Sequence, residues 1–131
     1  MTPQPHPFWP EGVPLEPPRP EGPLTHYLEQ AARRHPGKPA VIFAGGTLTY
    51  GQLAARVDAL AGYLQRRLGV KPGDRVLLAS QNCPQFLAAF YAVLRAGAVV
   101  VPVNPMSTAL ELEHYAHDSG ARLAIAAQEL L

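Results

Sequence analysis

The amino-acid sequence predicts an α/β fold in which an N-terminal β-hairpin is followed by the order αβαβαβ and a parallel three-stranded sheet. Three observations favour this class. Two stretches combine a capping-box spacing with apolar residues at helical intervals. Three short runs are almost wholly apolar without alternation, which is typical of strands covered on both faces. Helices and strands alternate along the chain, and this order implies parallel strands joined by crossovers.

Composition limits the class of protein. The chain has 131 residues, a length that suits one domain, and a formal net charge of only +1. That balance gives no reason to expect a nucleic acid or an anionic membrane as partner. The single cysteine excludes an intrachain disulfide and favours a reducing compartment. Because the first ten residues also lack the layout of a signal peptide, we expect a cytoplasmic protein.

The stretch 83–103 is long and apolar enough to raise the question of a membrane span. Arg95 lies in the middle of it and is followed by Gly97 and Pro102. The residue types also change, from Leu, Ala and Phe before the glycine to a run of Val after it. We therefore expect a helix followed by a strand, and no transmembrane segment.

The first 23 residues form a separate, proline-rich tail. Nine of them are proline, so this segment is expected to be extended and unable to pack a core of its own. Phe8 and Trp9 are its large aromatic residues. Two alternatives stay open for them: a disordered tail, or docking on this chain or on a partner subunit. The sequence thus divides into an extended tail, 1–23, and an α/β portion, 24–131.

The first helix and the hairpin come directly after the tail. Leu24, Leu28 and Ala31 or Ala32 share one helical face, and the sequence His35-Pro36-Gly37 ends that helix. Residues 41–43 and 47–49 then read as two strands around Ala44-Gly45-Gly46. Glycine tolerates the positive φ that a tight turn needs.

The second helix begins at a capping box. Thr49 and Gln52 have the required spacing, so the threonine side chain is expected to accept a free backbone N–H. An apolar stripe of about five turns follows, and Gly69 closes the helix. The stripe consists of Leu53, Val57, Leu60, Ala61, Leu64 and Leu68.

Three strands and two helices complete the pattern. The strands are residues 75–80, 98–103 and 121–127, with helices starting at Pro84 and after Thr108, which has capping-box spacing to Glu111. We expect residues 99–101 to be buried on both faces. Pro102 lacks an N–H and therefore suits the end of a strand or an edge strand. Because three strands make a thin sheet, we expect the natural domain to continue past Leu131.

Two histidines and the cysteine are candidates for chemistry. His114 and His117 are three residues apart on the last helix, a spacing that permits one metal ion. However, Leu112 and Tyr115 fit the buried side of that helix, so a solvated position for the histidines is favoured. Cys83 lies at a helix N-terminus, a position typical of reactive cysteines, but no partner histidine is near in sequence. A structural or capping role is favoured for it.

Two glycine-containing turns lack the context of a phosphate-binding loop. Residues 45–47 and 69–73 show neither a strand-GxGxxG-helix arrangement nor a G-K-[ST] ending. The strand ends at 80–82 and 104–107 are better candidates for ligand contact, because ligands of open α/β folds bind at the carboxyl edge of the sheet. The alternative for both is a plain connection.

Two motifs carry a resemblance to a known family. Residues 48–53, Leu-Thr-Tyr-Gly-Gln-Leu, resemble the first core motif of adenylate-forming enzymes, usually L-T-Y-x-E-L. Gln52 replaces the usual Glu. Residues 94–104, LRAGAVVVPVN, resemble the second core motif, usually L-K-A-G-x-A-Y-V-P-I-D. Asn104 stands where peptide-synthetase adenylation domains favour Asp. Both motifs have a structural interpretation, as a hairpin-to-helix junction and a helix-to-strand corner.

The resemblance spans residues 23–127 and implies the N-terminal part of an acyl-CoA synthetase, or fatty-acid–CoA ligase. Such enzymes use ATP and Mg²⁺ to make an acyl-adenylate and then pass the acyl group to coenzyme A. The sequence after Val103 is more similar to fatty-acid and aryl-acid ligases, so a medium- or long-chain fatty acid is the expected substrate. The family's phosphate loop, nucleotide contacts and catalytic lysine would lie downstream of Leu131.

The resemblance therefore implies an incomplete piece of a larger adenylate-forming domain. We expect no catalytic, cofactor-binding or metal-binding residue in this chain, no tight binding of ATP, Mg²⁺ or coenzyme A, and no activity of the 131 residues alone. The expected partners are the remainder of the parent enzyme and a carboxylic acid, and a homodimer stays open. Two alternatives remain: a stand-alone non-enzymatic interaction or assembly module, and a different nucleotide-binding α/β domain, which the missing glycine fingerprint argues against.

Overall fold

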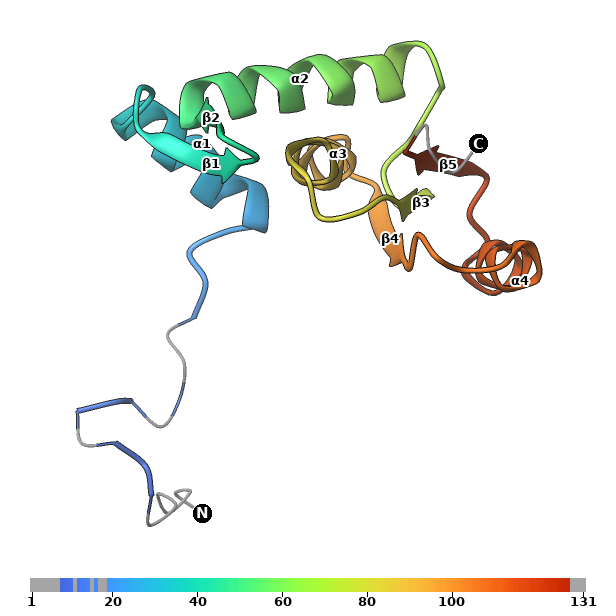
Figure 1. The fold of residues 1–131 in the computed structure, drawn as a ribbon, viewed down its shortest axis with the longest axis horizontal. Coiled ribbons are helices and arrows are strands. Elements are labelled where there is room, and N and C mark those ends of the chain that lie inside the picture. Colours follow the sequence, from blue (N-terminus) through green and yellow to red (C-terminus); the bar gives the residue numbers. More distant parts are fainter. Residues whose placement is uncertain (1–7, 11, 15, 17–18, 128–131) are drawn as a thin grey trace.

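The structure is a computed structural model that describes residues 8–10, 12–14, 16 and 19–127. Figure 1 shows the described residues of the tail lying apart from the packed elements. The expected α/β order is confirmed. In chain order the elements are α1 (Leu24–Arg34), β1 (Pro39–Phe43), β2 (Gly46–Thr49), α2 (Tyr50–Arg66), β3 (Arg75–Ala79), α3 (Pro84–Arg95), β4 (Val99–Val103), α4 (Ala109–Ser119) and β5 (Leu123–Ala126).

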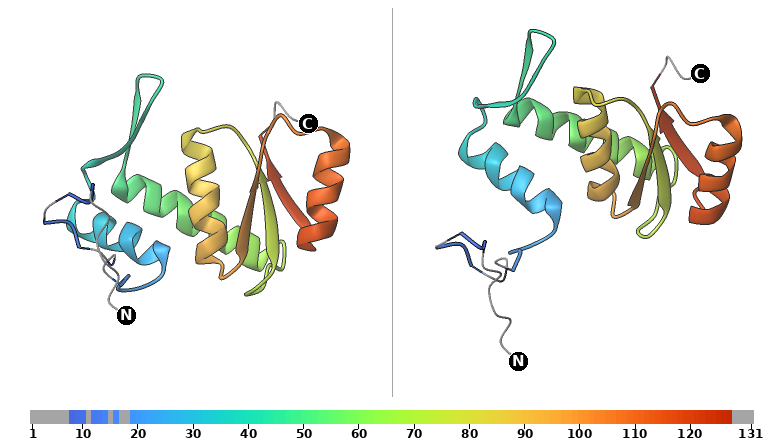
Figure 2. Two further views of the ribbon diagram at one scale, coloured as in Figure 1. Left: turned by 90° about the horizontal axis from the view of Figure 1, so that it is seen from below. Right: turned by 60° about the horizontal axis from the view of Figure 1, so that its bottom comes forward.

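The parallel three-stranded sheet is confirmed. Its order is β4-β3-β5, with both neighbours parallel to β3, and Leu78 of β3 is opposite Pro102 on one side and Ile125 on the other. The sheet lies between helices: α2 and α3 lie on one face and α4 lies on the other (Figure 2). The main core forms on the α2–α3 side, because these two helices also pack closely on each other.

The burial expected of β4 is wrong. Val99 is 48% exposed, and Val100 and Val101 are only half-buried. The reason is strand order: β3 is central and buried from Val76 to Ala79, whereas β4 is an edge strand whose outer face meets α4, a helix without a buried residue. The expectation that Pro102 suits an edge is confirmed by the same order.

The stripe of α2 is confirmed up to its last member. Its large members at 53, 57 and 64 are almost fully buried. Leu68 is 46% exposed, because the helix already ends at Arg66 and the chain turns through Gly69, whose φ is +68°. The N–H of Val70 donates to the carbonyl of Leu64 at 3.0 Å, which satisfies the helix end.

Both capping boxes are confirmed. At α2, the Thr49 hydroxyl accepts the N–H of Gln52 at 3.3 Å, and the Gln52 side chain accepts the N–H of Thr49 at 3.0 Å. At α4, Glu111 accepts the N–H of Thr108 at 2.7 Å and donates its own N–H to the threonine hydroxyl at 3.4 Å. Each box satisfies two backbone N–H groups that the first helical turn leaves without partners.

The hairpin is present, with a turn one residue shorter than expected. Phe43 of β1 is opposite Gly46 of β2, so only Ala44 and Gly45 form the turn. Both have positive φ, +47° and +78°, as a two-residue turn of this kind requires. The hairpin projects away from the helical layer (Figure 2), and Ile42 and Phe43, next to its turn, are apolar and exposed.

The corner between α3 and β4 is fixed by Gly97. Its φ is +80°, and a Cβ at this position would lie 3.3 Å from two side-chain atoms of Pro72. The carbonyl of Gly97 accepts the N–H of Gly73 at 2.9 Å, and the N–H of Val99 donates to the carbonyl of Asp74 at 2.7 Å. The turns before β3 and β4 are therefore bonded to each other, which sets the alignment of the two strands.

The tail aromatics lie at the surface of the described residues. Trp9 donates its indole N–H to the carbonyl of Val13 at 2.8 Å, within its own segment, and Phe8 is 87% exposed. Docking on a partner subunit stays a hypothesis. Within the described ranges, no helix has both the length and the apolar character needed to cross a membrane.

Candidate functional site

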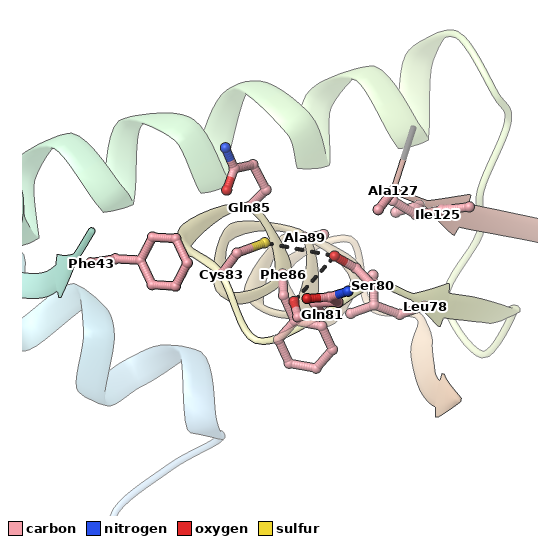
Figure 3. A pocket seen from close by; sticks show the side chains of 11 residues that line it. Phe43, Leu78, Ser80, Gln81, Cys83, Gln85, Phe86, Ala89, Ile125 and Ala127 are labelled. Carbon is pink, nitrogen blue, oxygen red and sulfur yellow. Dashed lines mark hydrogen bonds between the residues drawn. The ribbon is translucent and has the colours of Figure 1, made fainter. Parts of the chain in front are cut away.

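A cavity of about 660 Å³ opens at the carboxyl end of the parallel sheet (Figure 3). Four parts of the chain meet there: the end of β3 and the loop after it, the start of α3, the end of β5 and the tip of the hairpin. Its volume is within the range of small-molecule sites. The lining residues are Phe43, Leu78, Ser80, Gln81, Cys83, Gln85, Phe86, Ala89, Ile125, Ala126 and Ala127.

The position of the cavity agrees in part with the ligand-contact sites predicted from the sequence. Ser80 and Gln81, from the strand end expected to face ligand, line it, whereas Asn82 does not. The second expected strand end contributes Asn104 to a different, smaller cavity of about 320 Å³ between β4 and α4. There the Asn104 side chain accepts the N–H of Met106 at 2.9 Å, so it shapes the loop.

Sequence reasoning missed the hairpin and the end of β5 as parts of this site. Phe43 reaches the cavity from 37 residues before Ser80 in the chain. Ala126 and Ala127 reach it because β5 is parallel to β3 and ends at the same edge. The one signal available was the apolar tip of the hairpin, since exposed aromatic residues next to a turn commonly pack on something.

Among the described residues, the lining carries no charged side chain. Its polar groups are one hydroxyl, one thiol and two amides. The Ser80 hydroxyl donates to the carbonyl of Gln81 at 3.2 Å and lies 3.7 Å from the sulfur of Cys83. Because these described residues include no carboxylate, imidazole or ammonium group, they offer neither a general base nor a counter-ion for phosphate.

Cys83 occupies the N-cap position of α3, with Pro84 as the first helical residue. Its backbone is extended, but its side chain makes no capping hydrogen bond. The thiol is half-buried and faces the cavity beside Ser80. The expected position is confirmed, and what the sulfur contributes is packing rather than a cap.

The histidines of α4 lie on an exposed face. His114 and His117 are both exposed, whereas Leu112, Tyr115 and Ala116 are half-buried toward the sheet, as expected. Among the residues that the structure describes, no group of three or more His, Cys, Asp or Glu side chains is placed to hold a metal ion.

The turn at 69–73 uses its backbone N–H groups internally. The N–H of Lys71 donates to the Asp74 carboxylate at 2.7 Å, and the N–H of Gly73 donates to Gly97. A phosphate-binding loop needs such groups free and pointing at the ligand. These contacts support the interpretation of this segment as a plain turn.

These features together define a class. A hairpin leads through a capping box into a long helix, and two further helices alternate with parallel strands around a glycine corner. This is the arrangement that the two sequence motifs associate with adenylate-forming enzymes. Both motif segments have structural roles, as the cap of α2 and as the corner before β4.

Comparison with known proteins supports this class. Residues 28–131 match the family of AMP-binding enzymes. The chain is 45% identical over 102 residues to the long-chain-fatty-acid–CoA ligase of Salmonella typhimurium, which covers 78% of this chain and 18% of that protein. The chain therefore belongs to the AMP-binding, or adenylate-forming, enzyme family, and the expected resemblance is confirmed. It spans about a fifth of the length of the curated relatives it matches.

Solved structures agree with this assignment. A benzoate CoA ligase from Burkholderia xenovorans has a TM-score of 0.75 and 35% identity, over 81% of this chain and 22% of that one. The N-terminal subdomain of Klebsiella oxytoca NpsA, in complex with 3-hydroxyanthranilyl-AMSN, has a TM-score of 0.74 and 30% identity, over 79% of this chain and 26% of that one. The similarity extends over most of this chain and a minor part of each relative.

Proposed function

We propose that residues 24–131 are the N-terminal portion of an AMP-forming acid–CoA ligase, preceded by the extended tail 1–23. The observation that carries the proposal is the family match over 28–131, together with 45% identity to a long-chain-fatty-acid–CoA ligase. The parent enzyme would convert a carboxylic acid and ATP to an acyl-adenylate and pyrophosphate, and then form a thioester with coenzyme A. A cytoplasmic location is part of the proposal.

Neither the described lining of the cavity nor the turn at 69–73 fits the cofactors of that reaction. ATP, Mg²⁺ and the phosphates of coenzyme A need cationic side chains, carboxylates or free backbone N–H groups. The described residues that line the cavity at the sheet edge carry no charge, and the N–H groups of Lys71 and Gly73 are already bonded. This portion would therefore supply scaffold, and the nucleotide and metal sites would be built by the rest of the parent.

A direct assay tests whether the parent enzyme is active and the isolated 131-residue chain is inactive. The complete reading frame that contains residues 1–131 and the isolated 131-residue chain are purified in parallel. Acid-dependent ATP–pyrophosphate exchange is then measured for both. We expect exchange by the parent and none above the blank by the isolated chain. Exchange by the isolated chain would refute its inactivity, and a parent without a Ser/Thr/Gly-rich loop followed by lysine would favour a non-enzymatic module.

For the substrate we propose a medium- or long-chain fatty acid. The supporting observation is that relatives from Salmonella, Escherichia, Yersinia, Haemophilus and Bacillus carry the name long-chain-fatty-acid–CoA ligase. Acyl-CoA formation by the parent is compared for acetate, benzoate, octanoate and palmitate. Turnover of acetate or benzoate alone would defeat this choice of substrate, while the assignment as an acid–CoA ligase would stand.

A further inference from the structure

We propose that the amino end of the parallel sheet, together with the end of α2, is a docking surface for an anionic lipid bilayer. This basic surface consists of Arg67, Lys71, Arg75 and Arg122, with the exposed Leu68 directly after the first of them. It lies at the end of the sheet opposite the cavity. The proposal does not rest on the proposed function, because it concerns where the protein binds and not what it catalyses.

The fold brings the four cationic residues to one end of the sheet. The end of α2, the turn before β3 and the starts of β4 and β5 lie there together (Figure 2). Val76 of β3 is opposite Leu123 of β5, so Arg75 and Arg122, one residue earlier, begin neighbouring strands about 5 Å apart. The guanidinium of Arg75 donates to the carbonyl of Gly73 at 3.3 Å, which holds it at the turn that contains Lys71.

The positive charge of this surface is largely uncompensated. All four cationic residues are exposed, and none of them forms an ion pair within the part of the chain that the structure describes. Asp74 is the only acidic residue from 59 to 110, and its carboxylate already accepts the N–H of Lys71 at 2.7 Å. Like charges held close together repel one another, and an anionic partner relieves that repulsion.

The low net charge of the whole chain conceals this distribution. The basic surface holds four of the eleven Lys and Arg residues, and only one of the ten Asp and Glu residues lies within its turn. A formal net charge of +1 is an average over all faces of the molecule. It therefore does not argue against an anionic partner for this one face.

The apolar residues of this surface favour a lipid bilayer as that partner. Leu68 is exposed beyond the end of α2, and Tyr63 is exposed one helical turn before Arg67. A leucine flanked by arginines can enter the acyl region while the arginines extend to the phosphates. Three of the four cations are arginines, whose planar guanidinium suits a phosphate group. A nucleic acid would use the same charges but would leave Leu68 in water.

Sedimentation with vesicles tests the proposal on the complete reading frame that contains residues 1–131. One set of vesicles holds phosphatidylglycerol and phosphatidylcholine in equal parts, and the other holds phosphatidylcholine alone. We expect the protein to sediment with the anionic vesicles and to stay largely in the supernatant with the neutral ones. Binding should fall as NaCl is raised from about 0.05 M to about 0.5 M, because salt screens exposed charges.

A matched pair of charge variants locates the surface. Arg67→Gln combined with Lys71→Gln should lower the partition coefficient on anionic vesicles by about tenfold or more. Arg34→Gln combined with Lys38→Gln is the control, because it removes the same charge from two exposed residues at the other end of the molecule. The control should bind within about twofold of the wild type. Circular dichroism checks that both variants are folded.

A second pair of variants tests insertion of the leucine. Leu68→Ser should weaken binding to anionic vesicles by about threefold to tenfold, because less apolar surface then enters the bilayer. Leu110→Ser is the control, since Leu110 is 77% exposed and lies at the start of α4, away from the basic surface. This control should bind like the wild type.

Four outcomes would overturn the inference. They are absence of binding to anionic vesicles at low salt, equal binding to neutral vesicles, equal effects of the two charge variants, and equal effects of the two leucine variants. The first would leave an acidic protein or a nucleic acid as the partner of this face. Vesicle binding by a protein without ligase activity would support the inference and refute the proposed function. An active ligase that does not bind vesicles would do the reverse.

Discussion

Arg95 forms an ion pair of 2.5 Å with Glu29, which joins the C-terminal end of α3 to α1. A second guanidinium nitrogen of Arg95 lies 3.2 Å from the carboxylate of Asp58 on α2. One planar side chain therefore connects three helices. This matters most for α1, which buries only Leu28 in the core.

Arg95→Lys tests this connection. Lysine is the usual residue of the family motif here, but its single ammonium group cannot reproduce a fork that bonds two carboxylates through separate nitrogens. We expect the free energy of unfolding to fall by about 1 kcal/mol, measured by urea denaturation followed by circular dichroism. Arg33→Lys is the control, because Arg33 is 83% exposed and 4.0 Å from Glu29. Equal effects of the two changes would contradict a special role for Arg95.

Gly97→Ala tests the corner before β4. A non-glycine residue at positive φ costs about 1–2 kcal/mol, and here the new methyl group would also press on Pro72. Gly69→Ala separates the cost of the positive φ from the cost of the contact with Pro72. The φ of Gly69 is similarly positive, and no atom lies within 4 Å of a Cβ added there. The loss of unfolding free energy should be larger at Gly97. If both variants lose the same amount, the contact with Pro72 is unimportant.

The two capping boxes should differ in their response to pH. The backbone N–H and the hydroxyl of Thr108 lower the pKa of Glu111 below its ordinary value of 4.5. A carboxyl group with a lowered folded-state pKa stabilises the fold above its unfolded pKa, and this contribution disappears as the pH falls through the folded value. Glu111 therefore supports α4 at neutral pH and ceases to do so in acid.

A comparison of variants measures that difference. The gap in urea midpoint between wild type and Glu111→Gln should shrink as the pH falls from about 7 to about 3. The box at α2 has the neutral Gln52 in the equivalent position. Introducing Gln52→Glu should add a pH dependence of the same sign in that range. A gap that stays constant with pH would show that ionisation of Glu111 does not matter.

Leu64→Ala and Leu68→Ala test where the core side of α2 ends. Leu64 is 1% exposed, so its truncation should cost about 2–5 kcal/mol of unfolding free energy. Leu68 is 46% exposed beyond the helix end and should cost less than about 1 kcal/mol. Comparable losses at both positions would mean that the stripe continues to Leu68, as its spacing suggests.

Local chemistry accounts for what the sequence predicted correctly. Thr49 bonds Gln52 and Thr108 bonds Glu111, three residues away in each case, and Gly97 supplies the positive φ of a local turn, so the sequence was enough to place the helix starts and the corner. The parallel order followed from the alternation of helices with apolar runs.

The predictions that were wrong or missing concern features that depend on strand order and on distant contacts. Val99 to Val101 have the composition of a central strand, yet β4 is at the edge, and composition does not reveal position in the sheet. Similarly, nothing local to Phe43 indicates that it faces the loop after β3. The family, by contrast, could be recognised, because two motifs in the correct order restrict the fold more than either pattern alone.

The place of Trp9 has a practical consequence for any spectroscopic study. It is the only tryptophan in the sequence, and its indole is bonded within the tail rather than packed in the core. Its fluorescence therefore reports on the tail and on whatever binds there, while the sheet can unfold with little change in the emission spectrum. Trp9 is thus a built-in fluorophore with which the hypothesis of partner docking on the tail can be tested.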